Sequence, residues 1–205
     1  MSYAHIPISD FTGALSSSAP VPGGGGAAAL TGALGAALAS MVSNLTVGKK
    51  RYAEYEEDLR HIIDEAHELE QILIAQMDED ARCFEPLSRA YGRAKDDPKR
   101  DAIMEEALQL ACTAPLSIMK TAAQAILLHQ ERCEKGSRLV ISDVGVGVLC
   151  CKTALMGASL NILINAGLMK DRAYAENLLS DTQALLDKYC NLADDVYAAV
   201  LENLK

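Results

Sequence analysis

One aspartate of this chain stands where a helix would bury it. From Tyr52 to about Ala90, apolar side chains recur at steps of three and four residues, which predicts a long amphipathic helix. Asp80 falls within the apolar stripe, whereas Asp78 and Glu79 are expected to face water. A carboxylate on a buried face costs several kcal/mol unless it is paired or used. Two interpretations follow: a structural ion pair with a basic side chain of another helix, or a functional carboxylate such as a general base.

Two amides could act together with such a carboxylate. Asn161 and Asn165 lie one turn apart in the apolar stretch GASLNILINAG, so they share one face of a predicted helix. Buried amides require hydrogen-bond partners, which are either a ligand or the neighbouring backbone. Ser142 or Asp143, in SDVGVGV, stands where the same helix should begin, and we expect one of them to be its N-cap.

Four consecutive glycines, Gly23 to Gly26, open another predicted helix. Such a loop can bring backbone N–H groups and the positive end of a helix toward an anion. The surrounding sequence does not fit the GxxxxGK[ST] pattern, and no strand precedes it for a dinucleotide-binding fold. A flexible connector that lets one chain segment cross another closely is therefore an equal alternative.

The helix predicted after the glycines, residues 26–47, consists mostly of small side chains, and no charged residue occurs in residues 11–48. A span of about 20 apolar residues can cross a bilayer. However, a helix rich in Ala, Gly, Ser and Thr gains little on transfer to lipid. We therefore expect a buried helix whose small side chains, at positions 28, 32, 36 and 40, admit a neighbouring helix closely.

The end of this helix carries polar and basic residues. Asn44 and Thr46 lie in its last turn, and Lys49 and Lys50 follow. The two lysines either complement the C-terminus of the helix or bring positive charge to a site.

Composition narrows the class of protein. Half of the 205 residues are hydrophobic, with no Trp and only two Phe, so aliphatic side chains must fill the core, which favours closely packed helices. The net charge of −9 and the scattered Lys and Arg residues argue against a nucleic-acid-binding surface. Six cysteines without a CxxC and four histidines without an HExxH give no metal site. The N-terminus, MSYAHIPISD, lacks the features of a secretory signal, so we expect a cytoplasmic protein with free thiols.

The pattern of the whole chain is helical, without strand-like alternation, internal repeats or a low-complexity linker. The sequence predicts an all-α protein, a single multihelical domain over residues 1–205 built as a bundle of about five long helices. Ser9 or Asp10 is expected to cap a short helix that ends at Leu15. The long helices are expected over residues 26–47, 52–90, 103–133 with a kink at Pro115, 144–169, and 171–205.

Three stretches of the sequence carry a family resemblance. PVPGGGGAAALTGALGAALASMVSNLTVGKKRY resembles the signature of the cyclodeaminase/cyclohydrolase family, which includes the C-terminal domain of formiminotransferase-cyclodeaminase and stand-alone methenyltetrahydrofolate cyclohydrolases. MDEDARCFEPL is similar to the DEDAxAF segment of that family, and SDVGVGV with GASLNILIN is similar to its SDxGVG and GAxxNVxIN motifs. Two features depart from the pattern: Gly26 replaces the usual serine, and no LPK motif follows the long helix. Each departure indicates either a changed substrate preference or a relative with weakened or different activity.

The resemblance implies an all-helical subunit that forms a homodimer and acts on a one-carbon derivative of tetrahydrofolate, with neither a metal nor a redox cofactor. Neither a nucleic acid nor a membrane is expected as a partner. Matched by position, the residues implied at the folate site are Gly23, Gly24, Gly25, Asn44, Thr46, Lys49, Lys50, Asp80, Asp143, Asn161 and Asn165.

Two reactions fit these residues: hydrolysis of 5,10-methenyltetrahydrofolate to 10-formyltetrahydrofolate, and cyclodeamination of 5-formiminotetrahydrofolate to the methenyl form with release of ammonia. Each reaction needs a carboxylate near a cationic carbon and an acid close by. We expect Asp80 to act as base and electrostatic stabiliser, with Asp143 as a further catalytic candidate. Lys50, ahead of Lys49, would supply the acid or bind the anionic glutamate tail. The sequence does not separate the two reactions, and a non-catalytic folate-binding helical dimer is the alternative.

Overall fold

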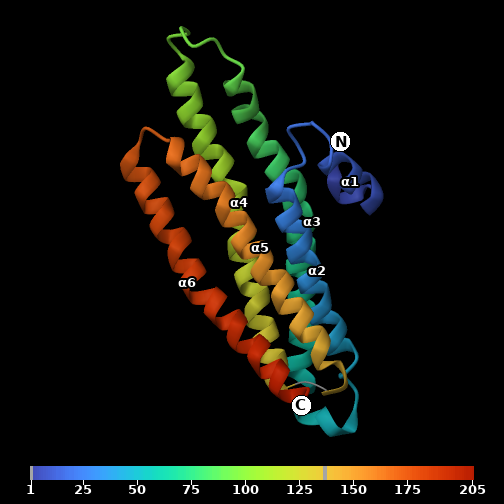
Figure 1. The fold of residues 1–205 in the computed structure, drawn as a ribbon. Helices are drawn as coiled ribbons and strands as arrows, with labels where there is room; N and C mark the ends of the chain where they lie inside the picture. Colours follow the sequence, from blue (N-terminus) through green and yellow to red (C-terminus); the bar gives the residue numbers. More distant parts are fainter. Residues whose placement is uncertain (1, 136–137) are drawn as a thin grey trace.

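The computed structural model describes residues 2–135 and 138–205, and these residues are mainly helical, without a strand. The prediction of an all-α chain with about five long helices is confirmed, whereas the single domain over residues 1–205 stays a prediction. The elements, shown in Figure 1, are η1 Tyr3–His5, α1 Ile8–Leu15, α2 Gly24–Asn44, η2 Lys50–Tyr55, α3 Glu56–Tyr91, α4 Arg100–Lys135, η3 Arg138–Val140, α5 Ile141–Leu168 and α6 Arg172–Asn203.

Four of the long helices form the bundle, and α6 covers one side of it. α2 packs against α3 and α5, α4 packs against the same two helices, and α6 lies on α5 and α4 (Figure 1). α2 and α5 run antiparallel, because Gly24 lies beside Asn161 while Gly35 lies beside Gly147. The N-terminus of α2 therefore lies at the same end of the bundle as the C-terminus of α5.

The small-residue helix α2 is buried where the sequence predicted it. A Cβ atom added at Gly35 would lie 2.4 Å from Cys151 Sγ, and one added at Gly32 would lie 3.1 Å from Ala154 Cβ. Closely packed interiors do not absorb such overlaps without shifting a helix. The absence of side-chain bulk on α2 thus allows α5 to approach its backbone.

Two buried side chains of α4 hold the C-terminal half of α2, Arg132 at its end and His129 near its middle. Arg132 Nη2 donates to the carbonyl of Val42 over 2.8 Å and also to the hydroxyl of Thr46. His129 Nε2 lies 2.9 Å from the carbonyl of Gly35, and burial lowers the pKa of this histidine to about 4. A cation at the last turn of α2 complements the negative end of the helix dipole.

Two predicted helix caps are wrong. The N-cap of α1 is Pro7, so Ser9 and Asp10 lie inside the helix. The N-cap of α5 is Val140, which leaves Asp143 in the first turn without a capping hydrogen bond. A carboxylate in the first turn already interacts favourably with the helix dipole, so the helix can begin one turn before it.

Asp78 also differs from expectation, since it does not simply face water. It is partly buried and accepts hydrogen bonds from the hydroxyl of Ser2, over 2.6 Å, and from the backbone N–H of Tyr3. The N-terminal segment is therefore tied to α3 two residues before Asp80. Phe11 of α1 is buried and lies near Gly26, so this segment also covers the start of α2.

Three helices, α2, α4 and α5, are long and apolar enough to cross a membrane, judged by length and composition alone. Part of this apolar surface fills the core of the bundle. Most of the large apolar side chains that these helices expose lie on α2 and α5, in two stripes that we call the α2/α5 face. Its large exposed side chains are Leu34, Met41 and Leu45 near α2 and Val146, Leu149, Met156, Leu160, Leu163, Ile164 and Leu168 on α5.

Candidate functional site

A cavity of about 300 Å³ opens where the N-terminus of α2 meets α3 and the C-terminal part of α5. This volume is at the lower end of the range for small-molecule sites, and the wall is mostly apolar with a few polar groups, as such sites usually are. The residues that line it are Pro20, Val21, Gly23, Gly24, Asp80, Phe84, Tyr91, Ala111, Asn161, Ile164 and Asn165.

Asp80 caps α2 from a different helix. The N-cap of α2 is Gly23, which has no side chain to accept a hydrogen bond from the first turn. Asp80 Oδ2 accepts that bond from the backbone N–H of Gly26 over 3.0 Å. The carboxylate also faces the positive end of the α2 dipole. A remote cap of this kind explains why α2 begins at Gly24 rather than at the predicted residue 26.

Adjacent glycines of the loop have different roles. A Cβ atom added at Gly25 would lie 2.0 Å from Asp80 Oδ1, so only glycine leaves room for the carboxylate. A Cβ atom added at Gly26 would meet Pro22 Cβ at 3.7 Å and the carbonyl of Met77 at 3.8 Å, which are ordinary contacts. The packing around a Cβ atom at position 26, where the family usually has serine, therefore does not require glycine.

The burial of Asp80 changes its acidity. Burial raises the pKa of the Asp80 carboxyl to about 6, and the hydrogen bond from Gly26 opposes the rise. Within the described part of the chain, no basic side chain forms an ion pair with Asp80. The structural ion pair that the sequence left open is therefore not observed. A carboxyl whose pKa lies near neutral, beside a cavity, has the properties of a general base.

The two asparagines of α5 lie on the same cavity. Asn161 lies beside Gly24, and its Nδ2 donates to the carbonyl of Gly157 over 3.2 Å, which orients the amide group. Asn165 is 6% exposed, and burial raises the pKa of the nearby Cys112 thiol to about 11. The structure thus brings Gly23, Gly24, Asp80, Asn161 and Asn165 together on one cavity, with Gly25 directly against Asp80.

Sequence reasoning missed the apolar walls of this cavity. Phe84 and Tyr91 of α3 line it, together with Ile164 of α5 and Val21 of the loop before α2. Aromatic rings of this kind can pack against a flat heterocycle. A signal was present for Phe84, which lies one turn after Asp80 in the predicted apolar stripe, whereas Tyr91 lies beyond the predicted end of that helix.

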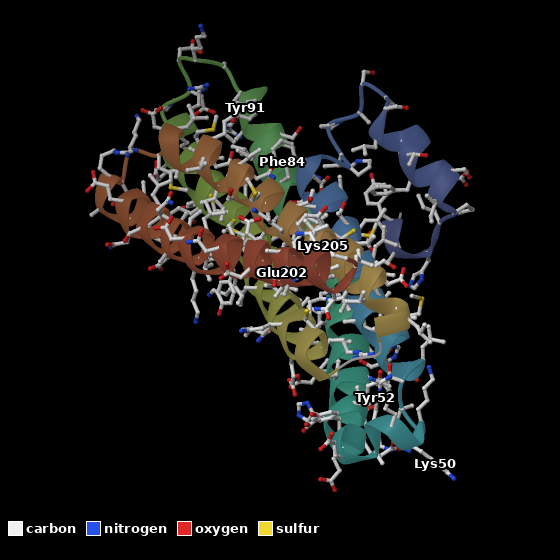
Figure 2. All side chains as sticks on the ribbon, turned by 60° about the horizontal axis from the view of Figure 1, so that its bottom comes forward. Lys50, Tyr52, Phe84, Tyr91, Glu202 and Lys205 are labelled. Atoms are coloured by element: carbon white, nitrogen blue, oxygen red, sulfur yellow. The ribbon has the colours of Figure 1, made fainter. Side chains whose placement is uncertain are left out.

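The remaining predicted residues lie at the other end of α2. α2 has 21 residues and is therefore about 30 Å long. Figure 2 shows Lys50 and Tyr52 far from Phe84 and Tyr91. Within one chain, Asn44, Thr46, Lys49, Lys50 and Asp143 are separated from Asp80 by about the length of α2, so their place at the folate site stays a prediction.

The local contacts of this second group are structural ones. Asn44 Nδ2 donates to the carbonyl and the hydroxyl of Ser40, one turn earlier. Thr46 is buried and accepts a hydrogen bond from Arg132. Lys49 and Lys50 are exposed.

The described residues contain no metal-ligand cluster. No group of three His, Cys, Asp or Glu among them is arranged to hold a metal ion. None of the six cysteines forms a disulfide in the described part of the chain.

The fold and the cavity can now be compared with known proteins. A family model described as formiminotransferase-cyclodeaminase matches residues 7–184. The chain belongs to this family. It is 42% identical over 197 residues to the methenyltetrahydrofolate cyclohydrolase of Methylorubrum extorquens, a match that covers 94% of this chain and 95% of that relative. The family resemblance inferred from the three motifs is confirmed.

More distant members of the family are larger or share only the fold. The formimidoyltransferase-cyclodeaminase of Sus scrofa is 32% identical over 208 residues, which cover 100% of this chain but 38% of that relative. The crystal structure of formiminotetrahydrofolate cyclodeaminase from Thermotoga maritima matches with a TM-score of 0.85 at 24% identity, over 98% of this chain and 96% of that one. This likeness establishes the fold.

Proposed function

We propose that this protein is an enzyme of folate one-carbon metabolism that hydrolyses 5,10-methenyltetrahydrofolate to 10-formyltetrahydrofolate. The observation that carries the proposal is Asp80, a partly buried carboxyl with its pKa raised to about 6 at the N-terminus of α2, on a cavity with two asparagines. The relative that matches along nearly its whole length, at 42% identity, bears the name methenyltetrahydrofolate cyclohydrolase. This match favours hydrolysis over cyclodeamination.

The residues of the cavity suggest a sequence of proton transfers. The methenyl carbon carries positive charge shared by two nitrogens, so ionised Asp80 attracts it and can accept a proton from an attacking water. The resulting tetrahedral carbon holds a hydroxyl group. Asp80 then returns its proton to N5 as the carbon–N5 bond breaks, and loss of the hydroxyl proton completes the formyl group on N10. Phe84 and Ile164 would exclude bulk water from the ring system.

The predicted site residues at the far end of α2, among them Lys49 and Lys50, suggest a dimer. We propose that a second copy covers the α2/α5 face through a twofold axis that crosses the middle of α2. Two antiparallel α2 helices would then bring Lys49 and Lys50 of the partner subunit to the end of the bundle that carries Asp80. An exposed apolar surface of this extent is typical of an interface. A solution mass of twice 21.9 kDa supports the dimer, and a monomer at micromolar concentration contradicts it.

We also propose that the reaction needs no metal or redox cofactor and that the enzyme acts in the cytoplasm. In support of the metal-independent reaction, the described residues offer no cluster of metal ligands. Dialysis against a chelator should leave the rate unchanged; a rate that falls and is restored by a divalent cation would contradict this proposal.

Cyclodeamination is the second candidate, because the chain aligns over its full length with a relative named formimidoyltransferase-cyclodeaminase. One spectrophotometric experiment separates the candidates. Protein is mixed with 5,10-methenyltetrahydrofolate and, separately, with 5-formiminotetrahydrofolate, and the methenyl chromophore is followed. Loss of the chromophore faster than in buffer supports hydrolysis. Its formation in the second mixture, with ammonia released, indicates cyclodeamination. No change in either mixture would contradict both and favour a folate-binding protein.

A further inference from the structure

The N-terminal segment, residues 2–22, is tied to α3 by one carboxylate. Asp78 accepts hydrogen bonds from the hydroxyl of Ser2, over 2.6 Å, and from the backbone N–H of Tyr3. The Tyr3 ring in turn meets the Phe11 ring edge to face, with 6.0 Å between the two ring centroids. Phe11 belongs to α1, which lies near the N-terminal end of α2 (Figure 1). A chain of contacts therefore runs from Asp78 through the N-terminal segment to the start of α2.

Phe11 is the side chain through which this segment reaches the site. It is 2% exposed and is the one buried residue of α1. Its Cζ atom lies 4.0 Å from the place of a Cβ atom at Gly26, where Pro22 and the carbonyl of Met77 are also neighbours. The backbone N–H of Gly26 is the one that Asp80 accepts. Neither Phe11 nor Pro22 lines the cavity, so these two side chains cover that hydrogen bond from outside it.

α1 does not hold this position by itself. A helix of eight residues is marginal in water unless tertiary contacts support it. Apart from Phe11, the side chains of α1 are exposed or half-buried. The hydrogen bonds at Asp78 and the burial of Phe11 are therefore what keeps the segment over the start of α2. Loss of either would admit water to the N–H of Gly26.

We propose that Asp78 is a positioning residue of the active site, which ties the N-terminal segment over α2 so that Phe11 keeps water from the bond between Gly26 and Asp80. The inference rests on the proposed function, in which Asp80 is the base. A hydrogen bond that water does not reach is stronger and holds the carboxylate in one geometry. Water at this point would also return the pKa of Asp80 toward its ordinary value of 3.8, because burial is what raises it to about 6.

Few titratable groups surround Asp80. Within its own cavity Tyr91 is the other one, because α2 contributes glycine backbone and α5 contributes two amides. On α4, the thiol of Cys112 stays protonated at neutral pH, since burial raises its pKa to about 11. The titratable groups of the neighbouring cavity, which shares Pro20 and Val21 with the first, are Tyr3, Asp78, Arg82, Glu85 and Arg89. Both arginines pair with glutamates, so the charge of Asp78 is the one that the experiment must separate from its hydrogen bonds.

The test follows the pH dependence of kcat/KM in Asp78→Ala and Phe11→Ala. In each variant the acid limb of the profile, where the base becomes protonated, should move to lower pH by on the order of one pH unit. Hydrogen exchange of the Gly26 N–H should become about tenfold faster, as expected when a charge-assisted hydrogen bond is weakened. Glu79→Ala is the matched control, because this next residue of α3 carries the same charge but pairs with Arg82. It should keep the acid limb and the exchange rate of wild type.

Two milder variants distinguish positioning from a general loss of structure. Ser2→Ala removes one of the two hydrogen bonds to Asp78 and no charge, so it should move the acid limb in the same direction by less. Phe11→Leu keeps an apolar side chain over Gly26 and should retain the limb of wild type. A purely structural defect would lower the rate at every pH without moving the limb. Circular dichroism of each variant checks that the chain remains helical.

The outcomes separate this inference from the function on which it rests. An acid limb and an exchange rate unchanged in Asp78→Ala or in Phe11→Ala overturn the inference while hydrolysis stands. An equal shift in Glu79→Ala also overturns it, since the charge alone would then be the cause. A folded wild-type protein that turns over neither folate overturns the proposed function. Faster exchange of the Gly26 N–H in both alanine variants, with wild-type exchange in Glu79→Ala, would even then support the shielding of this bond by the N-terminal segment.

Discussion

The two ends of α2 are held by the same electrostatic device with opposite signs. At the N-terminus, the Asp80 carboxylate of α3 accepts the N–H of Gly26; at the C-terminus, Arg132 of α4 donates to the carbonyl of Val42. Each charge complements the pole of the helix that it faces. Burial raises the pKa of Asp80 to about 6 and lowers the pKa of Arg132 to about 10.

The ends differ in access and in acidity. Asp80 borders a cavity of about 300 Å³, whereas Arg132 is 0% exposed. The shifted pKa of Asp80 falls near neutral, so its charge can change during a reaction, while Arg132 stays protonated at pH 7. A buried charge at a helix end therefore supports chemistry only where a cavity reaches it and its pKa is near the working pH.

Apart from replacement of Asp80 itself, Gly25→Ala is expected to have the largest effect on this comparison of the two ends of α2. The added methyl group overlaps Asp80 Oδ1, so the carboxylate must leave its position at the α2 N-terminus. A displacement of about 1 Å costs on the order of 10²-fold in rate. Gly26→Ala is the matched control, because a Cβ atom at position 26 makes only ordinary contacts. Equal kcat values for the two variants, measured with the methenyl chromophore, would contradict the role given to Gly25.

At the opposite end, Arg132→Met should lower stability more than activity. The substitution removes the hydrogen bonds to Val42 and Thr46 from a fully buried place, at a cost of about 2 kcal/mol in the free energy of unfolding. Urea unfolding measures this loss, with Arg60→Met, on the exposed face of α3, as the control. An Arg132→Met protein that unfolds like wild type, or whose kcat falls as much as that of Gly25→Ala, would contradict the structural role given to Arg132.

The smallest expected effect is the pH dependence that Asp80 gives to the free energy of unfolding. Since burial raises the pKa of Asp80 from 3.8 to about 6, the folded protein binds this proton more tightly than the unfolded chain does. The stabilisation of the folded state by this bound proton is therefore complete below about pH 4, and it is lost as the pH rises through 6. The Asp80→Asn variant has no carboxyl at this position to ionise, so its stability should not fall over this pH range. At pH 8 the unfolding free energy of Asp80→Asn should exceed that of wild type by on the order of 1 kcal/mol. An equal or lower value at pH 8 would contradict the burial of an unpaired carboxylate.

The sequence correctly predicted the features that follow from which residues share one face of a helix. Periodicity gave the five long helices, the small-residue stripe of α2 and the shared face of Asn161 and Asn165, because a helix fixes which residues lie together within two or three turns. It also singled out Asp80, since a carboxylate in an apolar stripe is conspicuous.

The residues that cap the helices were predicted poorly. The caps expected at Asp10 and Asp143 were wrong, and α2 is capped instead by Asp80, a residue 54 positions from the N–H that it accepts. Lys50 was expected near the site of Asp80 because both belong to one family pattern, and this expectation stays a prediction. The length of α2 separates them by about 30 Å, which the predicted helix of 22 residues, 26–47, already implied.

The most direct test of the account is the turnover of Asp80→Asn with 5,10-methenyltetrahydrofolate across pH 5 to 8. Asparagine keeps the shape of the side chain and an oxygen for the N–H of Gly26, so the fold should remain. The account predicts a loss of about 10²–10⁴-fold in kcat. It also predicts that kcat/KM of the wild type falls below about pH 6, where Asp80 becomes protonated. A folded Asp80→Asn protein with the kcat of wild type would contradict the central claim, because the reaction would then need no base at the N-terminus of α2.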